Sequence, residues 1–309
     1  MFYYRIHGLK VASDYRMEAA YAIPAFSAAE RDVWVHEGVL DEWLTTEPDG
    51  EKIKGSGLFY RYEKTRGWVR AIGNGCFLMQ NRNEIIYQLK EGHEPLFIAE
   101  VILCLCLGII IIQKGRLIIH GSGILWGNRA VIISGQSGSG KSTLAQAILR
   151  DGGIFMSDDA AAVVLDEGKA FVYPGYPQQK LTASAAKAYM LDTAKLIPLP
   201  KEGGEEKFAL RFKEWYAGEK EELHAMIILR VDDVEHGKIK KITGSEKLKR
   251  FTDNLYKYNA YKTMGFSKEH FMASVQIASQ IELYELIRPV NGLTVEEEVL
   301  MLKEVLRPA

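Results

Sequence analysis

Residues 135–142, with the sequence GQSGSGKS, are the part of this chain whose types and spacing most directly predict chemistry. They match the pattern G-x-x-x-x-G-K-[ST], in which glycines let successive backbone N–H groups turn inward around phosphate oxygens. An apolar run, VIIS, precedes the motif, and a helix-forming run, STLAQAILR, follows it. The pattern therefore predicts a phosphate loop (P-loop) for a nucleotide at a helix N-terminus.

Each residue type in the motif has an expected task. Lys141 is expected to reach the β- and γ-phosphates of the nucleotide, and the Ser142 hydroxyl to bind Mg²⁺. The predicted nucleotide-binding residues are Gly135, Gln136, Ser137, Gly138, Ser139, Gly140, Lys141, Ser142 and Thr143. Because GTPases, ATP-driven machines and several classes of kinase share this loop, the motif alone does not identify a reaction.

Polar residues on both sides of the motif could complete a phosphoryl-transfer site. His120 stands before the loop, and the adjacent Asp158 and Asp159 follow the next predicted strand. Transfer to a hydroxyl requires a base for its proton and metal ions on the phosphates, and carboxylates at a strand tip can serve either purpose. Aspartate pairs are otherwise common in solvated turns, and histidine is often partly buried at a strand end. The order of tasks within the pair stays open.

Residues 116–164 resemble the HPr kinase/phosphorylase superfamily. In that family a histidine lies at the same distance upstream of the phosphate loop, and the strand after the loop's helix ends in an Asp–Asp pair. The spacings from His120 to Lys141 and from Lys141 to Asp159 fit without insertion. The strand-rich start, QKGRLIIHGSG and YPGYPQQKL are similar to related serine kinases encoded near peptide-modification genes, including those of lasso-peptide clusters.

The resemblance implies a serine kinase that uses ATP and Mg²⁺ and forms a homo-oligomer. Its acceptor would be a serine hydroxyl of a peptide or small protein, such as the C-terminal serine of a lasso precursor peptide. Asp159 would be the base, Asp158 would hold Mg²⁺ through water, Lys141 would clamp the phosphates and His120 would support the base or the phosphate. The family's glutamate in an EIRG-like segment has no counterpart in residues 173–181, so no second metal ligand is assigned.

Two cations and two other functions remain as alternatives. Lys180 and Arg211 are candidates for contacting phosphate or an acidic substrate, although lysine and arginine are mostly ordinary surface charges. A nucleotide-gated regulatory module would need metal binding but no positioned base. A small-molecule kinase acting on free serine would need the same site with a smaller acceptor.

The surrounding pattern predicts an α/β fold in two domains. Residues 1–94 are expected to form a smaller strand-rich N-terminal domain, and residues 95–309 a P-loop kinase-like domain of the HPr kinase C-terminal type, with apolar strands alternating with helices. The predicted strands are residues 2–6, 33–36, 57–62, 67–72, 76–80, 84–89, 117–120, 130–134, 154–156, 161–165, 225–231 and 281–288. The predicted helices are residues 95–113, 141–150, 184–191, 245–258, 268–279 and 295–306, with a polar loop at residues 197–222.

Composition restricts the partners and the compartment. The 39 basic and 40 acidic side chains leave a formal net charge of −1, which supplies no overall field for nucleic acid or an anionic membrane. The apolar run at residues 96–112 is slightly short for a bilayer and carries Glu100, so a buried core helix is predicted. Three sparse cysteines and a start without a secretory pattern predict a cytoplasmic protein.

Overall fold

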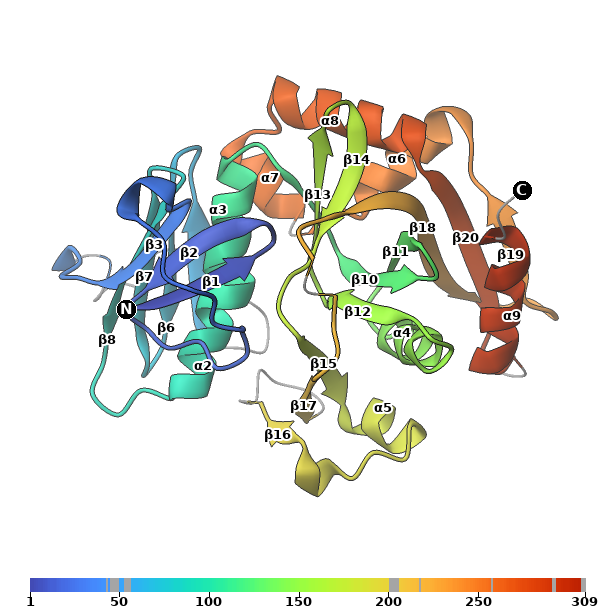
Figure 1. Cartoon of the computed structure of the whole chain (residues 1–309), viewed down its shortest axis with the longest axis horizontal. Coiled ribbons are helices and arrows are strands. Elements are labelled where there is room, and N and C mark those ends of the chain that lie inside the picture. Colours follow the sequence, from blue (N-terminus) through green and yellow to red (C-terminus); the bar gives the residue numbers. More distant parts are fainter. Residues whose placement is uncertain are drawn as a thin grey trace. The chain divides into compact units, whose positions relative to one another are not determined.

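The computed structural model describes residues 1–42, 44, 50–52, 57–199, 206–216, 218–256, 258–290 and 293–306. The fold is mixed α/β with several sheets, and the chain divides into two compact units (Figure 1). The first unit comprises Met1–Arg116, Lys180–Arg211 and Asn259–Ser267, and the second comprises Leu117–Gln179, Phe212–Tyr258 and Lys268–Ala309. This division differs from the predicted boundary between residues 94 and 95, because the apolar helix and two later segments belong to the first unit.

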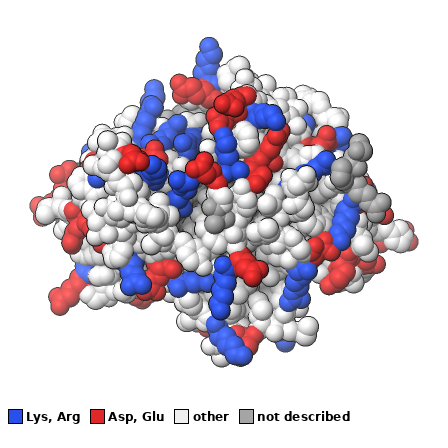
Figure 2. Space-filling view, in the orientation of Figure 1, with Lys and Arg blue, Asp and Glu red and all other residues white. Residues whose placement is uncertain are grey.

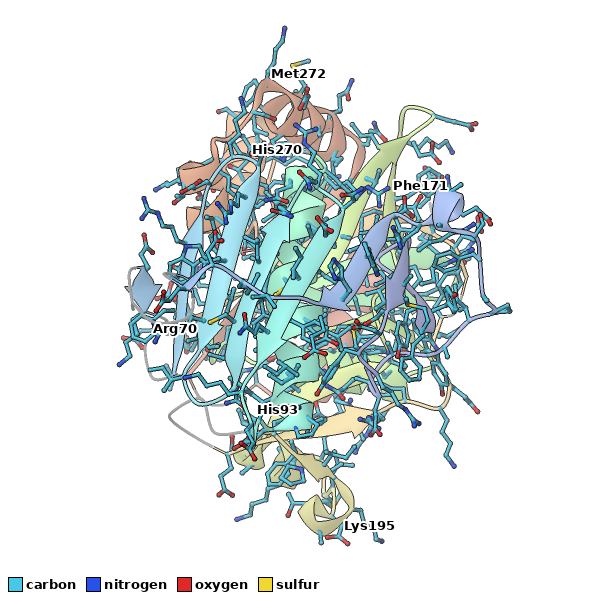
Figure 3. The ribbon with its side chains drawn as sticks, turned by 90° about the vertical axis from the view of Figure 1, so that its left-hand side faces the viewer. Arg70, His93, Phe171, Lys195, His270 and Met272 are labelled. Carbon is cyan, nitrogen blue, oxygen red and sulfur yellow. The ribbon has the colours of Figure 1, made fainter. Side chains whose placement is uncertain are left out.

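The first unit is built on an eight-stranded sheet with the order β1-β2-β3-β8-β7-β6-β5-β4, seen from its face in Figure 3. Its strands are β1 (Phe2–Ile6), β2 (Leu9–Ser13), β3 (Val33–Glu37), β4 (Glu51–Lys52), β5 (Leu58–Tyr62), β6 (Arg66–Ala71), β7 (Gly75–Gln80) and β8 (Glu84–Leu89). The six predicted strands are confirmed, whereas β2 and β4 were not predicted. β2 forms a hairpin with β1 through His7 and Gly8, whose φ values are 52° and 74°, as a tight two-residue turn requires.

One long apolar helix packs against β7 of this sheet. It runs as α2 (Pro95–Glu100), a π-helical segment (Val101–Cys106) and α3 (Leu107–Gln113). Of the described helices, it alone has the length and composition to cross a membrane, and 83% of its most apolar window is buried inside the protein. Burial of this extent agrees with the predicted core helix.

The region predicted as a polar loop, residues 197–222, contains strands instead. β16 (Ile197–Pro198) and β17 (Lys207–Arg211) form a three-stranded sheet with β15 (Gln178–Thr182), and residue 221 already begins the long strand β18. The apolar core of β17 is only three residues, FAL, between charged neighbours. Pairing buries Ala209 to 2% exposure, so tertiary contact overrides the polar composition. Residues 200–205 and 217 lie outside the described residues.

The second unit is built on a nine-stranded sheet. The order β12-β10-β11-β18-β14-β13-β9 is extended by β20, which pairs with β18, and by β19, which pairs with β20. These strands are β9 (Leu117–Ile119), β10 (Gly121–Trp126), β11 (Arg129–Gly135), β12 (Ile154–Ser157), β13 (Ala161–Asp166), β14 (Lys169–Tyr173), β18 (Glu221–Asp232), β19 (Lys238–Lys241) and β20 (Glu282–Pro289). β11, β18 and β20 are parallel neighbours, and their apolar runs are those of strands covered on both faces.

Helices cover this sheet and fix its central strands. The helices of the second unit are α4 (Lys141–Arg150), α6 (Gly244–Asp253), α8 (Lys268–Gln280) and α9 (Val295–Leu306). Two further helices, α5 (Ala183–Ala188) and, from Asn259 on, α7 (Tyr258–Met264), belong to the first unit. Leu144 and Ile148 of α4, Leu302 of α9 and Val131 and Ile133 of β11 share one buried core cluster. The helix predicted at residues 245–258 is wrong at its end, because α6 stops at Asp253 and a second helix follows.

Two phenylalanines on helices of the second unit test this packing. Phe251 on α6 is 0% exposed, whereas Phe271 on α8 is 49% exposed, beside Met272, which projects outward in Figure 3. Phe251→Ala should lower the free energy of unfolding by about 3–5 kcal/mol, since it leaves a cavity. Phe271→Ala should change it by less than about 0.5 kcal/mol. Urea unfolding of both variants measures the difference, and equal effects would contradict the described burial of α6.

Candidate functional site

The glycine-rich loop connects β11 to α4, which confirms the predicted strand–loop–helix context. Gly135, Gly138 and Gly140 have φ values of 139°, 80° and 96°, which side chains disfavour. A Cβ atom at Gly135 would lie 2.5 Å from the carbonyl oxygen of Leu229, the residue of β18 that pairs with it. The close approach of two backbones therefore requires glycine where the loop begins.

Lys141 is folded back over this loop. Its Nζ donates to the carbonyl oxygens of Gly135 at 2.9 Å and Gln136 at 3.0 Å. Burial lowers the pKa of the ammonium, and the charges of Asp159 and Asp158 act on that pKa in the opposite direction. The loop lysine and the aspartate pair are thus brought into one electrostatic environment.

The loop has features that fit a bound anion. Ser139 is 6% exposed, and its Oγ has no hydrogen-bond partner among the described residues. A buried hydroxyl without a partner costs about 1–3 kcal/mol, and a phosphate oxygen would supply one. Ser142 and Thr143 lie in the first turn of α4, and both are half-buried, where helix N–H groups favour negative charge.

The two aspartates lie in the turn after β12, but their environments differ. Asp158 Oδ1 accepts a hydrogen bond from Ser122 Oγ at 2.8 Å. The side chain of Asp159 accepts no hydrogen bond from the described residues, and its φ is 59°. The Asp159 carbonyl oxygen accepts from the N–H of Gly121 at 3.3 Å and lies 3.1 Å from His120 Nδ1. A carbonyl can only accept, so Nδ1 carries a proton in this contact.

His120 and the last residues of β11 are held by the end of α6. Ser134 Oγ lies 2.6 Å from the His120 carbonyl oxygen and 2.9 Å from Asn254 Oδ1. The His120 N–H donates to the Asn254 carbonyl oxygen at 2.8 Å. Asn254 Nδ2 in turn donates to the carbonyl oxygen of Arg250 at 2.8 Å. One asparagine therefore ties the strand that enters the loop to the backbone of His120.

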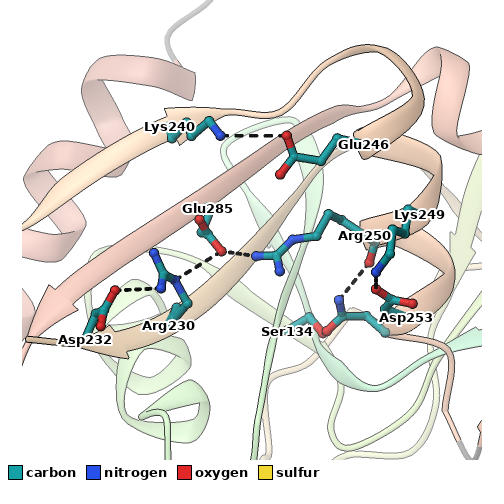
Figure 4. Close-up of polar contacts among 10 residues, drawn as sticks. Ser134, Arg230, Asp232, Lys240, Glu246, Lys249, Arg250, Asp253 and Glu285 are labelled. Atoms are coloured by element: carbon teal, nitrogen blue, oxygen red, sulfur yellow. Dashed lines mark hydrogen bonds and ion pairs between the residues drawn. The ribbon is translucent and has the colours of Figure 1, made fainter.

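A cavity of about 500 Å³ lies against the first half of the loop, between the ends of β18 and α6. Arg230 and Arg250 line it, and both contact the carboxylate of Glu285, which is 8% exposed (Figure 4). Arg230 also pairs with Asp232 at 2.6 Å. Two guanidinium groups therefore share two carboxylates, and the charge of this cluster is balanced.

A second cavity, of about 380 Å³, borders His120 and the turn after α6. Gly135, Gln136, Asp253 and Asn254 line both cavities, so the two spaces adjoin along the loop. The centroid of the Tyr256 ring lies 5.9 Å from the centroid of the His120 ring. The space beside His120 has room for a small acceptor group.

Sequence reasoning missed Ser122, Asn254, Arg230 and Arg250. The sequence does indicate Arg230, because this residue stands near the end of an apolar strand. Parallel strands place their carboxyl ends at one edge of a sheet, where ligands bind. Arg250 and Asn254 carry no such signal, because charged and polar residues on or just after an amphipathic helix are ordinarily solvated. Ser122 lies in a glycine-rich strand that was not predicted.

Lys180 and Arg211 both belong to the first unit, whereas the loop belongs to the second. Lys180 Nζ lies 2.8 Å from Glu100 and 3.2 Å from Cys104 Sγ. Arg211 lies 4.0 Å from Glu18. Each cation therefore has a carboxylate partner within its own unit, which fits ordinary charge pairing.

The described surface shows neither a single-sign charged face in Figure 2 nor a ready-made cluster of metal ligands. On the face drawn in Figure 2, basic and acidic side chains are intermixed among the described residues. In the described part of the chain, no three His, Cys, Asp or Glu side chains gather to hold a metal ion. Mg²⁺ is commonly bound by one or two carboxylates together with substrate phosphates and water, so Ser142 and Asp158 fit such a site.

Comparison with solved structures shows a distant likeness to a kinase/phosphatase. The HPr(Ser) kinase/phosphatase from Coxiella burnetii is similar with a TM-score of 0.31 and 11% sequence identity, over 61% of this chain and 89% of that chain. No family model matches the chain. No curated protein matches it either.

The two loop glycines at residues 135 and 138 give a matched test of the loop's geometry. A Cβ atom at Gly138 would have no atom within 4 Å, so Gly138→Ala should cost about 1–2 kcal/mol of unfolding free energy through its positive φ alone. Gly135→Ala adds the collision with β18 and should cost about 3 kcal/mol or more. Chemical denaturation distinguishes them. A smaller loss for Gly135→Ala would mean that β11 and β18 are farther apart than described.

Proposed function

We propose that this protein is an ATP- and Mg²⁺-dependent kinase that phosphorylates a serine hydroxyl of a peptide or small protein. The observation that carries the proposal is the carboxylate of Asp159, which accepts no hydrogen bond from the described residues and acts on the Lys141 ammonium. A nucleotide sensor requires metal binding but no further carboxylate beside the loop lysine. A kinase requires one to take the proton of the acceptor.

The loop would bind the nucleotide through its backbone. The N–H groups of residues 136–143 and the Ser139 hydroxyl would contact phosphate oxygens. Lys141 would leave the two loop carbonyl oxygens and contact the β- and γ-phosphates instead. Its ammonium is partly desolvated, so a charged hydrogen-bond partner would stabilise it. Ser142 and Asp158 would hold Mg²⁺, which neutralises charge on the phosphates when bound.

Transfer would proceed with Asp159 as the base. The serine oxygen forms a bond to the γ-phosphorus while the bond from that phosphorus to the β–γ bridging oxygen breaks, and ADP leaves. The hydroxyl proton passes to the Asp159 carboxylate. His120 contacts the Asp159 backbone at its carbonyl oxygen, so it would position the base rather than react.

Support for a peptide acceptor comes from the sequence resemblance to peptide-modifying serine kinases. The C-terminal serine of a lasso-type precursor peptide is the first such acceptor to test. The 380 Å³ cavity beside His120 also has room for free serine, which makes a small-molecule kinase the second candidate.

Substitution of each aspartate by asparagine should affect phosphoryl transfer in a different way. Asp159→Asn keeps the shape but cannot take the proton, so transfer should fall by about 10²–10⁴-fold with nucleotide affinity unchanged. Asp158→Asn should instead raise the Mg²⁺ concentration that gives half-maximal activity. Titration of Mg²⁺ with each variant measures both effects. If excess Mg²⁺ rescued both variants equally, neither aspartate would be the base.

The acceptor can be identified by mass spectrometry. The protein with Mg²⁺ and ATP is incubated with serine peptides, including ones that end in serine, and separately with free serine. We expect one phosphoryl group on a peptide serine, and none with Lys141→Ala, since removal of a group that meets transition-state charge costs about 10²–10³-fold. Phosphate on free serine alone would favour the small-molecule kinase. ATP hydrolysis without any acceptor would favour a regulatory module.

A further inference from the structure

A separate cavity lies at the other end of β11 from the phosphate loop. β11 runs from Arg129 to Gly135, and this cavity of about 290 Å³ lies at its Arg129 end. Its lining includes Trp126, Arg129, Val131, His224, Lys303 and Leu306. Its volume is at the lower end of the range of small-molecule sites.

Among the described residues, Arg129 in this cavity has hydrogen-bond partners that are all neutral. Its Nη1 donates to His224 Nε2 at 2.9 Å and to the carbonyl oxygen of Leu306 at 3.3 Å. A guanidinium can only donate, so His224 Nε2 accepts in this contact and the imidazole is neutral. Burial and the charge of Arg129 also lower the pKa of His224. Among the described residues, no carboxylate forms an ion pair with Arg129.

The acidic groups around His224 are already engaged. Glu222 pairs with Lys169 at 2.8 Å, and Glu282 pairs with Lys241 at 2.5 Å. Arg129 is half-buried, and a partly desolvated cation without a counter-ion is costly. Within the part of the chain that the structure describes, the cavity therefore presents one positive charge without an ion-pair partner.

The rest of the lining is neutral or apolar. Lys303 pairs with Asp151 at 2.6 Å, and Trp126 Nε1 donates to the same carboxylate at 3.1 Å. The polar edge of the Trp126 ring is thus satisfied outside the cavity. Val131 and Leu306 complete an apolar wall.

We propose that this cavity binds a small monocarboxylate with an aromatic or branched aliphatic body. The carboxylate pairs with the Arg129 guanidinium, whose planar fork suits two parallel hydrogen bonds. The body packs on Trp126, Val131 and Leu306. A single uncompensated charge matches a monoanion better than a phosphate ester, which would bring a second charge into the same apolar space.

Calorimetric titration with benzoate, phenylacetate and indole-3-acetate tests this site directly. The matched neutral amides, benzamide and phenylacetamide, serve as ligand controls. We expect at least one carboxylate to bind roughly 10-fold or more tightly than its amide, since a charged hydrogen-bonding partner is lost. Arg129→Met should abolish that preference, Arg129→Lys should keep part of it, and Lys141→Ala should leave it unchanged, which separates this site from the phosphate loop.

A second variant keeps the test decisive if Arg129→Met unfolds. Leu306→Glu would bring a carboxylate to the cavity and should remove carboxylate binding by pairing with Arg129, with circular dichroism as the check of folding. Equal affinity for acids and amides, or no binding of any of the three acids at millimolar concentration, would overturn the proposal.

Discussion

Parallel pairing of β11 with β18 is the constraint on which the rest of the site depends. The pairing continues to Gly135 and Leu229, where the backbones approach too closely for any Cβ atom. The chain must therefore turn away from the sheet at that residue, and the turn delivers Lys141 to the start of α4. Arg230 immediately follows Leu229, so the same register also places the first guanidinium of the neighbouring cavity.

The second constraint is the short turn between β9 and β10. His120 lies between these strands, and its backbone is bonded to Asn254 while its ring contacts the carbonyl of Asp159. Ser134, one residue before the loop, contacts both His120 and Asn254. Movement of α6 would therefore shift the loop strand and the turn of the aspartates together. The position of that helix would therefore affect both a nucleotide bound at the loop and an acceptor in the adjoining cavity.

The local parts of the site could be predicted from sequence, because each depends on a short run of residues. The apolar run before Gly135, the helix after Lys141 and the aspartates after β12 all follow from patterns within about 30 residues of the chain. Ser122 was missed because β10 begins with Gly121 and Gly123, which favour a loop assignment. Asn254 and Arg250 were missed because their importance comes from contacts with Ser134 and Glu285, far away in sequence. The division into two compact units differs from the predicted boundary for the same reason, since the packing of the helix at residues 95–113 against β7 is a tertiary contact.

A partly buried cation lies beyond one end of β11 and another lies at its other end, but the partners of the two cations differ. At one end Lys141 is partly desolvated, and Asp159 and Asp158 offset that penalty. At the other end Arg129 is half-buried with a neutral imidazole and a carbonyl as its partners. Between them Val131 and Ile133 pack into the cluster that also holds Leu144 and Ile148 of α4, while Trp126 and Leu306 pack against its edge. A ligand on Arg129 would therefore rest on the same packed core as the helix that begins at Lys141.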